Sequence, residues 1–366
     1  MVNIFHVDLL RLASNLQYVS QLDEVISGST SEVSFVSYSD SFTNDILGPD
    51  VSSELVDTKS WKAFHEAGVY SHATGKIYLT SKSPNAVEDQ INVTSIDIEN
   101  DDSISSDHIK GIANANGGAA FYPVGTPADS SEGQQIVFCD QGTPDLPPGL
   151  IAFDPASGNT KVLVNNFLGR NFLSPNDVVQ HSETGDLWFT DPPYAYIQGF
   201  RPAPTSRLQV YRFELNTGVI QAVADGFDAP NGIEFSPDLK HVYITDSGSV
   251  GIPHFFVNET GPSSIYRYDV TDDGKRLENR QLFAYVDNGI PDGIHADTNG
   301  NVFVGVGDGV NVYNPEGILI GKFGVAGGAA NFAFAPGALY IFNEYSLFKV
   351  SGLQAEGRTV KRDFKL

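Results

Sequence analysis

The chain has 366 residues, enough for two average domains or for one large domain built from repeats. Its 36 Gly, 20 Pro, 15 Tyr and 24 Phe, with only 18% charged residues, favour short strands joined by tight turns and exclude a protein made mainly of long surface helices. The formal net charge of -23 argues against nucleic acid or an anionic bilayer as a partner.

The N-terminal region leaves the compartment open. The first residues, MVNIFHVDLLRLASNLQ, lack the basic end and the continuous apolar stretch of a secretory signal, whereas glycosylation triplets at Asn92 and Asn258 are compatible with secretion. We therefore expect a secreted or a cytoplasmic protein. No run of about 18 apolar residues is present, so we expect a soluble chain with no membrane span. The single cysteine, Cys139, lies in an apolar run and is expected to be a buried thiol.

Six related units follow one another between Trp61 and Val350. Four are well formed, and each has a polar residue at a corner, an alternating strand, a Gly-containing turn and a second apolar strand. These four contain FHEAGVY, LSPNDVV, APNGIEF and IPDGIHA, and two weaker copies contain NANGGAAF and AGGAANF. The points taken as equivalent are Glu66, Gly118, Asn176, Asn231, Asp292 and Asn331.

A second pattern, an aromatic strand followed by a turn and another strand, lies between these units, as in LIAFDPASGNTKVLV. Two strands plus two strands make a four-stranded blade, and radially arranged blades expose only short edges. The sequence therefore predicts an all-β fold, a six-bladed β-propeller in one domain over residues 1–366, with recognisable repeats at 61–350. The last repeat has only one further strand, SLFKVSGL, so we expect the segment 1–60 to supply the closing strand, with EVSFVSYS as the candidate.

The corner residues of the well-formed units suggest a metal site. Because the innermost strand of each blade begins at the same end of the ring, we expect these side chains to meet at one point. Two carboxylates and two amide carbonyls suit Ca²⁺, with Mg²⁺, Mn²⁺ and Zn²⁺ as alternatives. One Pro-Asn-Gly alone is an ordinary turn, but three such tripeptides in register indicate a shared site. The expected ligands are Glu66, Asn176, Asn231 and Asp292.

The same residues make the chain similar to the SMP-30/gluconolactonase/LRE-like family, and within it to fungal lactonohydrolases that act on aldonolactones and pantoyl lactone. The similarity rests on His-Glu-Ala-Gly from His65, Ser-Pro-Asn-Asp from Ser174, Ala-Pro-Asn-Gly from Ala229 and Ile-Pro-Asp-Gly from Ile290. It implies a six-bladed propeller that hydrolyses a lactone with a divalent metal bound by the four expected ligands. It also implies that Asp292 is the general base.

Further catalytic candidates lie next to the expected ligands. A carboxylate that holds a cation has a lowered pKa and is a weak base, so His65, beside Glu66, and His295, three residues after Asp292, are alternative bases. Asp140 and the corresponding acidic residues of the next two units recur at the end of the second strand, which is typical of loop capping.

Candidate substrate contacts come from the weak units and from one loop. Asn116 and Asn331 are expected to complete the ring of corner residues around the substrate, together with Asn176. Ser174 stands where animal members of the family carry a sugar-binding arginine, so that mode of sugar binding does not transfer. The long aromatic loop DPPYAYIQGFRPAPTSR is expected to roof the pocket. Its candidate contacts are Tyr194 and Arg201.

Three functions remain open at this point. The first is metal-dependent opening of a lactone by water, with a small-molecule substrate and no covalent intermediate. The second keeps the site but attacks a phosphotriester or fluorophosphate, and the third is a binding propeller without catalysis. No Gly-x-Ser-x-Gly elbow and no phosphate-binding loop is present, which argues against a serine hydrolase or a nucleotide-using enzyme. The sequence does not indicate an oligomeric state.

Overall fold

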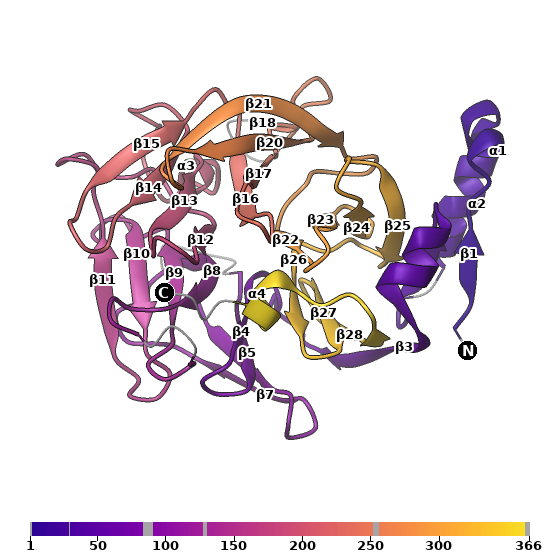
Figure 1. Cartoon of the computed structure of the whole chain (residues 1–366), viewed down its shortest axis with the longest axis horizontal. Helices are drawn as coiled ribbons and strands as arrows, with labels where there is room; N and C mark the ends of the chain where they lie inside the picture. Colours follow the sequence, from indigo (N-terminus) through magenta and orange to yellow (C-terminus); the bar gives the residue numbers. More distant parts are fainter. Residues whose placement is uncertain (1, 29, 83–90, 127–129, 252–255, 363–366) are drawn as a thin grey trace.

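The computed structural model describes residues 2–28, 30–82, 91–126, 130–251 and 256–362. Six sheets stand around a common axis (Figure 1), which confirms the predicted six-bladed β-propeller. The first blade contains β4 (Glu66–Ser71), β5 (Lys76–Thr80), β6 (Val93–Asp97) and β7 (Ser103–Asp107). The second contains β8 (Ala115–Phe121), β9 (Gln135–Asp140), β10 (Gly149–Phe153) and β11 (Thr160–Val164). The third contains β12 (Val178–Gln180), β13 (Leu187–Asp191), β14 (Gln209–Phe213) and β15 (Ile220–Ala224).

The last three blades continue the pattern. The fourth blade contains β16 (Pro230–Phe235), β17 (His241–Asp246), β20 (Ser264–Thr271) and β21 (Arg276–Tyr285). The fifth contains β22 (Ile294–Ala296), β23 (Val302–Val306), β24 (Gly309–Tyr313) and β25 (Leu319–Gly324). The sixth contains β26 (Asn331–Ala335), β27 (Ala338–Asn343), β28 (Ser346–Leu353) and β3 (Leu47–Thr58). In every blade the neighbouring strands are antiparallel, as the predicted hairpins require.

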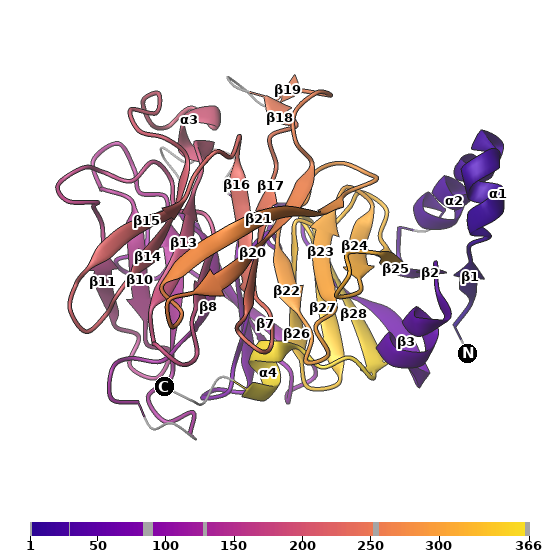
Figure 2. The same cartoon turned by 45° about the horizontal axis from the view of Figure 1, so that its top comes forward.

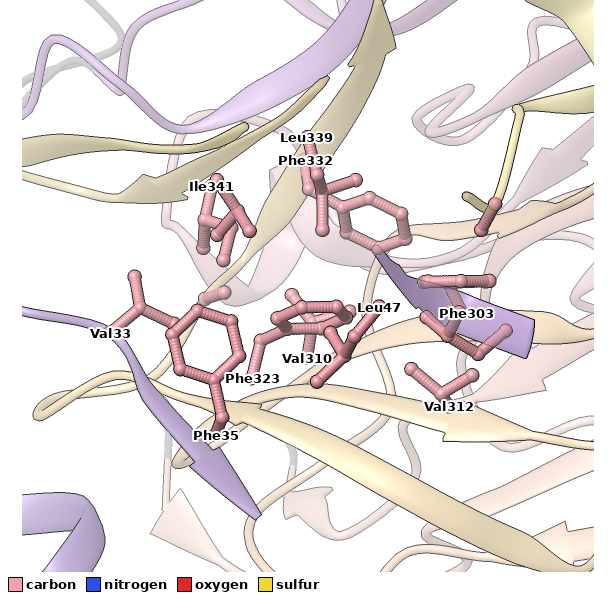
Figure 3. Packing of buried hydrophobic residues seen from close by; sticks show 14 of the residues in the cluster. Val33, Phe35, Leu47, Phe303, Val310, Val312, Phe323, Phe332, Leu339 and Ile341 are labelled. Carbon is pink, nitrogen blue, oxygen red and sulfur yellow. The ribbon is translucent and has the colours of Figure 1, made fainter. Parts of the chain in front are cut away.

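Apolar side chains fill the spaces between neighbouring blades. Figure 3 shows one such cluster, in which Phe303, Val310 and Phe323 of the fifth blade face Phe332 and Leu339 of the sixth. All five side chains are fully buried. Each blade is therefore apolar on both faces, which fixes the inner strands rigidly about the axis.

The closing strand differs from the one expected. Blade six is completed by β3, which pairs antiparallel with β28, so the N- and C-terminal regions do share a blade. EVSFVSYS instead contains β2 (Ser34–Ser37), which extends the fifth blade through β25 and pairs with β1 (Ile4–His6). Half of the residues of β3 are exposed and the strand lacks apolar alternation, whereas three of the four residues of β2 are buried.

The helices and the remaining short elements lie outside the blades. Figures 1 and 2 show the first two helices beside the ring, and Figure 2 shows α3 and α4 at opposite ends of the sheets. No helix of the described segments has the length and apolar character needed to cross a bilayer. These elements are α1 (Leu9–Ser14), α2 (Leu16–Ser27), the π-helix η1 (Phe42–Ile46), α3 (Tyr194–Ile197), β18 (Val250–Gly251), β19 (Phe256–Val257) and α4 (Arg358–Arg362).

The C-terminal segment crosses from blade six toward the axis. The amide of Ala355 donates to the carbonyl of Ile46, and the amide of Thr298 donates to the carbonyl of Glu356. Gly357 then forms a β-bridge with Asp297 of the fifth blade. These contacts place α4 across the end of the ring that lies opposite α3 (Figure 2).

Candidate functional site

Four side chains from four blades converge at the end of the ring nearer α3. Asn176 Nδ2 donates to Asn231 Oδ1 at 2.5 Å, and Asn231 Nδ2 donates to Asp292 Oδ1 at 2.6 Å. Glu66 is near enough to Asp292 for the two carboxyl groups to interact directly. Glu66, Asn176 and Asn231 are buried, and Asp292 is partly buried. The structure thus brings together all four expected metal ligands, here called the polar ring.

The two acidic members of the polar ring lack a basic partner. Burial and the neighbouring Asp292 carboxylate hold the pKa of Glu66 well above its usual range. Burial likewise raises the pKa of Asp292, although the charges of His65 and Lys82 oppose this effect. Asn331 Nδ2 donates to Glu66 Oε2 at 2.9 Å, so the predicted contact residue of the sixth blade touches the ring. Among the described residues, neither carboxylate forms an ion pair with Lys or Arg.

Buried threonines of one blade hold the ring residues of the next. The hydroxyl of Thr190 donates to the carbonyl of Asn231 at 2.6 Å, and that of Thr245 to the carbonyl of Asp292 at 3.0 Å. Thr80 donates in the same way to Asn116 at 2.8 Å. Sequence reasoning missed these threonines, although their repetition directly before Ser81, Asp191 and Asp246 was a usable signal.

Glycine follows Asn231 and Asp292 because the next blade occupies the space of a side chain. A Cβ on Gly232 would lie 2.6 Å from the carbonyl oxygen of Asp292, and one on Gly293 would lie 2.2 Å from Asn331 Cγ. The register of β16 also shifts between Pro230 and Ile233, and such bulges re-aim side chains. In the Pro-Asn-Gly corner, the proline therefore fixes the backbone that enters the strand, the asparagine supplies a side chain of the polar ring, and the glycine allows close contact with the next blade.

The second blade contributes Asn116 rather than the expected equivalent, Gly118. Ala115 pairs with Asp140 as Pro230 pairs with Asp246, so Asn116 takes the position that Asn231 has in blade four. Its carbonyl is held by Thr80, as described above. Asn116 is buried, and its Oδ1 has no hydrogen-bond partner within the described segments.

Two hydroxyl groups support Asn231. Its Nδ2 lies 3.1 Å from the hydroxyl of Tyr194 and 3.0 Å from Ser247 Oγ. Ser247 also donates to the carbonyl of Pro291 at 2.6 Å, directly before Asp292. Tyr194 therefore reaches the polar ring from α3 above it, and Ser247, which sequence reasoning missed, ties the ring residues of blades four and five together.

The other loop candidates serve backbone contacts in this structure. Ser174 Oγ accepts from the amide of Ala195 at 3.1 Å and so holds α3. Arg201 Nη1 donates to the carbonyls of Thr143 and Leu146, which ties the loop after α3 to the second blade. The predicted capping residues accept bonds from the backbone amides that lead into the inner strands, which confirms their capping position. They are Asp140, Asp191 and Asp246.

The two candidate histidines lie at different levels. His65 Nδ1 is 3.3 Å from Glu344 Oε1, and His65 is near enough to Asp292 for its charge to lower that pKa. His295 Nδ1 is 3.5 Å from Glu234 Oε2 and belongs to a second group of polar side chains. Only His65 is thus placed beside the polar ring.

That second group, here called the lower layer, lies between the polar ring and α4 and consists of Asp177, Glu234, His295 and Arg358. Arg358 donates to Glu234 Oε1 from Nη2 at 2.7 Å and from Nε at 3.2 Å. Burial alone would raise the pKa of Glu234, but Arg358 and His295 lower it. All four side chains line a cavity of about 30 Å³, roughly the space for one water molecule.

The donor set of the polar ring fits a hard divalent cation. It offers two carboxylates with no basic partner and amide oxygens, and the nearby Asn116 Oδ1 is buried without a partner. Such oxygen ligands suit Ca²⁺, whereas zinc sites normally contain His or Cys. Within the described segments, no group of three or more His, Cys, Asp and Glu side chains is arranged to hold a metal. Any ion held here would therefore depend on the amides.

Comparison with solved structures agrees with the fold. A gluconolactonase of Xanthomonas campestris superposes with a TM-score of 0.68 at 22% identity, covering 89% of this chain and 95% of that protein. The calcium-binding protein regucalcin of Agrobacterium tumefaciens superposes with a TM-score of 0.59 at 16% identity, covering 86% and 98%. At these identities the likeness shows a shared fold.

Sequence comparison shows the family. Lactonohydrolase oryL of Aspergillus oryzae is 35% identical over 200 residues, 51% of this chain and 45% of that protein. The gluconolactonase of Zymomonas mobilis is 27% identical over 207 residues, so the matches span about half the length of both relatives. Residues 80–341 match the SMP-30/Gluconolactonase/LRE-like region. This chain belongs to the SMP-30/gluconolactonase/LRE-like family.

Proposed function

We propose that this chain is a metal-dependent lactone hydrolase whose cation, Ca²⁺, is held by the polar ring. The observation that carries the proposal is the meeting of the buried Glu66 carboxylate with the partly buried Asp292 carboxylate, neither of which forms an ion pair with Lys or Arg within the described segments. Buried charges are normally paired or coordinate a metal. The printed names of the relatives, a lactonohydrolase and a gluconolactonase, support a lactone as the substrate.

The residues around the ring divide the chemical tasks. A bound divalent cation would polarise the lactone carbonyl and stabilise the charge that develops on its oxygen. Asn231 and Asp292 keep their positions through Ser247 and Thr245, so the donors need little rearrangement during the reaction. Because α4 and Arg358 lie across the opposite end of the ring, we expect substrate to approach from the end nearer α3.

Proton removal from the attacking water falls to His65. Asp292 is a weak base while it holds a cation. His65 lies beside it, with Nδ1 3.3 Å from Glu344 Oε1, and we assign the role of proton acceptor to its Nε2. Water would then add to the carbonyl carbon as His65 takes its proton. The ring C–O bond would break as His65 returns that proton to the leaving oxygen, which gives the hydroxy acid without a covalent intermediate.

Acid release from lactones, measured before and after removal of divalent ions, tests the proposal. Activity should vanish with a strong chelator, return with Ca²⁺ and be lost in Asn231→Ala. Full activity in metal-free protein would refute the mechanism. Turnover of a phosphotriester but of no lactone would instead assign the second function considered above, to which the 63-residue match with serum paraoxonase/arylesterase 2 of the dog at 35% identity gives some support.

A further inference from the structure

Asn116 and Gln141 of the second blade each bury an amide atom that makes no hydrogen bond within the described segments. The atoms are Asn116 Oδ1, an acceptor, and Gln141 Nε2, a donor, and the two residues are 8% and 4% exposed. Buried polar atoms in native proteins are nearly always bonded, so such a pair indicates a ligand or a bound water.

The register of the blades gives Asn116 and Gln141 the positions that Asn231 and Ser247 hold in blade four. Ser247, directly after Asp246, donates its amide to the carbonyl of Ala229. Gln141, directly after Asp140, donates its amide in the same way to the carbonyl of Asn114. Gln141 thus takes the position in blade two that Ser247 has in blade four.

In blade four, the corresponding side chains bond to each other. Asn231 Nδ2 lies 3.0 Å from Ser247 Oγ, and both also contact other ring residues. In blade two, Asn116 corresponds to Asn231 and Gln141 to Ser247, but no such bond forms. The donor and the acceptor of blade two therefore remain for another molecule.

The surrounding groups are already engaged in fixing the backbone. Asp140 accepts from the amides of Ala113, Asn114 and Gly142, and Asn114 Nδ2 donates to the carbonyl of Gly142 at 2.6 Å. The local fold is therefore held without Asn116 Oδ1 and Gln141 Nε2, and these two atoms are not needed for folding.

We propose that Gln141 and Asn116 together recognise a hydroxyl group of the lactone substrate. Gln141 Nε2 donates to the hydroxyl oxygen, and the hydroxyl hydrogen donates to Asn116 Oδ1. A hydroxyl is the simplest group that satisfies a donor and an acceptor at once. A lactone without it leaves both buried atoms unpaired and is selected against. This assignment rests on the proposed function and names the residues that set its specificity.

The test compares two lactones that differ only in this group, α-hydroxy-γ-butyrolactone and γ-butyrolactone. The wild type should prefer the hydroxylated ring by about 100-fold or more in kcat/KM. Gln141→Leu and Gln141→Glu both remove the donor and should reduce that preference at least about 10-fold. Asn116→Asp keeps an acceptor oxygen and should keep the preference within about 3-fold, since its added charge affects both lactones alike.

A matched control and the opposite outcomes complete the test. Asn159→Ala, an exposed amide of the same blade, should leave the preference unchanged. Equal losses on both lactones in Gln141→Leu, or no change in preference, would overturn the inference. A wild type that opens neither lactone would refute the proposed function instead. Calorimetric titration of both lactones would then decide, and binding that is insensitive to the hydroxyl or to Gln141→Leu would overturn the recognition site.

Discussion

The polar ring and the lower layer share one axis, and both contain buried carboxylates. The two layers differ in the groups that lie next to these carboxylates. In the lower layer, the guanidinium of Arg358 from α4 pairs with Glu234, and His295 approaches its second oxygen. In the polar ring, Glu66 and Asp292 accept hydrogen bonds from the amides of Asn331 and Asn231, and within the described segments neither carboxylate forms an ion pair with Lys or Arg. Under the proposed function, the chain supplies its own cation at one level and leaves the other for an ion from solution. On that proposal, the lower layer is structural and the polar ring is reactive.

Removing a carboxylate from the ring should have the largest effect. Asp292→Ala should lower lactone turnover about 10³-fold or more, equivalent to about 4 kcal/mol, because a proposed ligand is lost. In the presence of chelator, the same change should raise Tm, since it relieves the repulsion on Glu66. Acid-release kinetics and thermal melts check both effects. A lower Tm in chelator would show that the two carboxylates do not repel each other.

Removing the guanidinium of Arg358 from the lower layer should lower the stability of the protein and leave the metal affinity of the polar ring nearly unchanged. Arg358→Ala leaves Glu234 buried and uncompensated, so unfolding should become easier by about 3–5 kcal/mol. Denaturant unfolding measures this, with calcium titration alongside. The double change Glu234→Met and Arg358→Met is the control and should restore most of the stability. A loss of calcium affinity equal to that of a ring variant would contradict the separation of the layers.

Removing the hydroxyl of one of the buried threonines that hold the ring residues should have an intermediate effect on stability and turnover. Thr245→Val leaves the carbonyl of Asp292 and the amide of Gly232 without their hydroxyl partner, at a cost of about 1–3 kcal/mol. It should also lower kcat, because Asp292 shifts. Thr205→Val, an exposed control, should change stability by less than about 0.5 kcal/mol. Equal effects of the two variants would remove the positioning role of Thr245.

The smallest expected effect concerns Glu344 at the edge of the ring. Burial alone would raise its pKa, but His65, Lys82 and Lys62 lower it to about 2. A depressed carboxyl pKa contributes stability above its usual value near 4.5 that is lost as the pH falls toward 2. Glu344→Gln should therefore flatten the decline of stability between pH 4.5 and 2. Parallel unfolding curves for both proteins in this range would contradict the assignment.

The fold was largely predictable because each inner hairpin carries its own signal. Pro230 and Gly232 fix a corner locally, and the same pattern recurs in register in other blades. The closing strand was assigned wrongly, because β3 is exposed at an outer edge and its polar residues give no apolar alternation. Edge strands owe their place to the neighbouring strand, here β28.

The site was predictable in part for the same reason. Glu66, Asn231 and Asp292 were visible as repeated corner residues, and the structure brings them together. The sequence could not identify Gln141 as a candidate, because the reason to single it out is that its Nε2 has no hydrogen-bond partner within the described part of the folded chain.

By itself, the sequence determined the six repeats, the turns and the polar corner of each inner strand, because these depend on local backbone preferences and on alternation along one strand. Only the tertiary structure decided which charges are compensated. Arg358 reaches Glu234 across more than a hundred residues of chain, and nothing near Arg358 in the sequence indicates this. Contacts between blades, unlike turns, arise from closure of the ring. Closure pairs Glu234 with Arg358 in the lower layer, whereas within the described segments Glu66 and Asp292 form no ion pair with Lys or Arg.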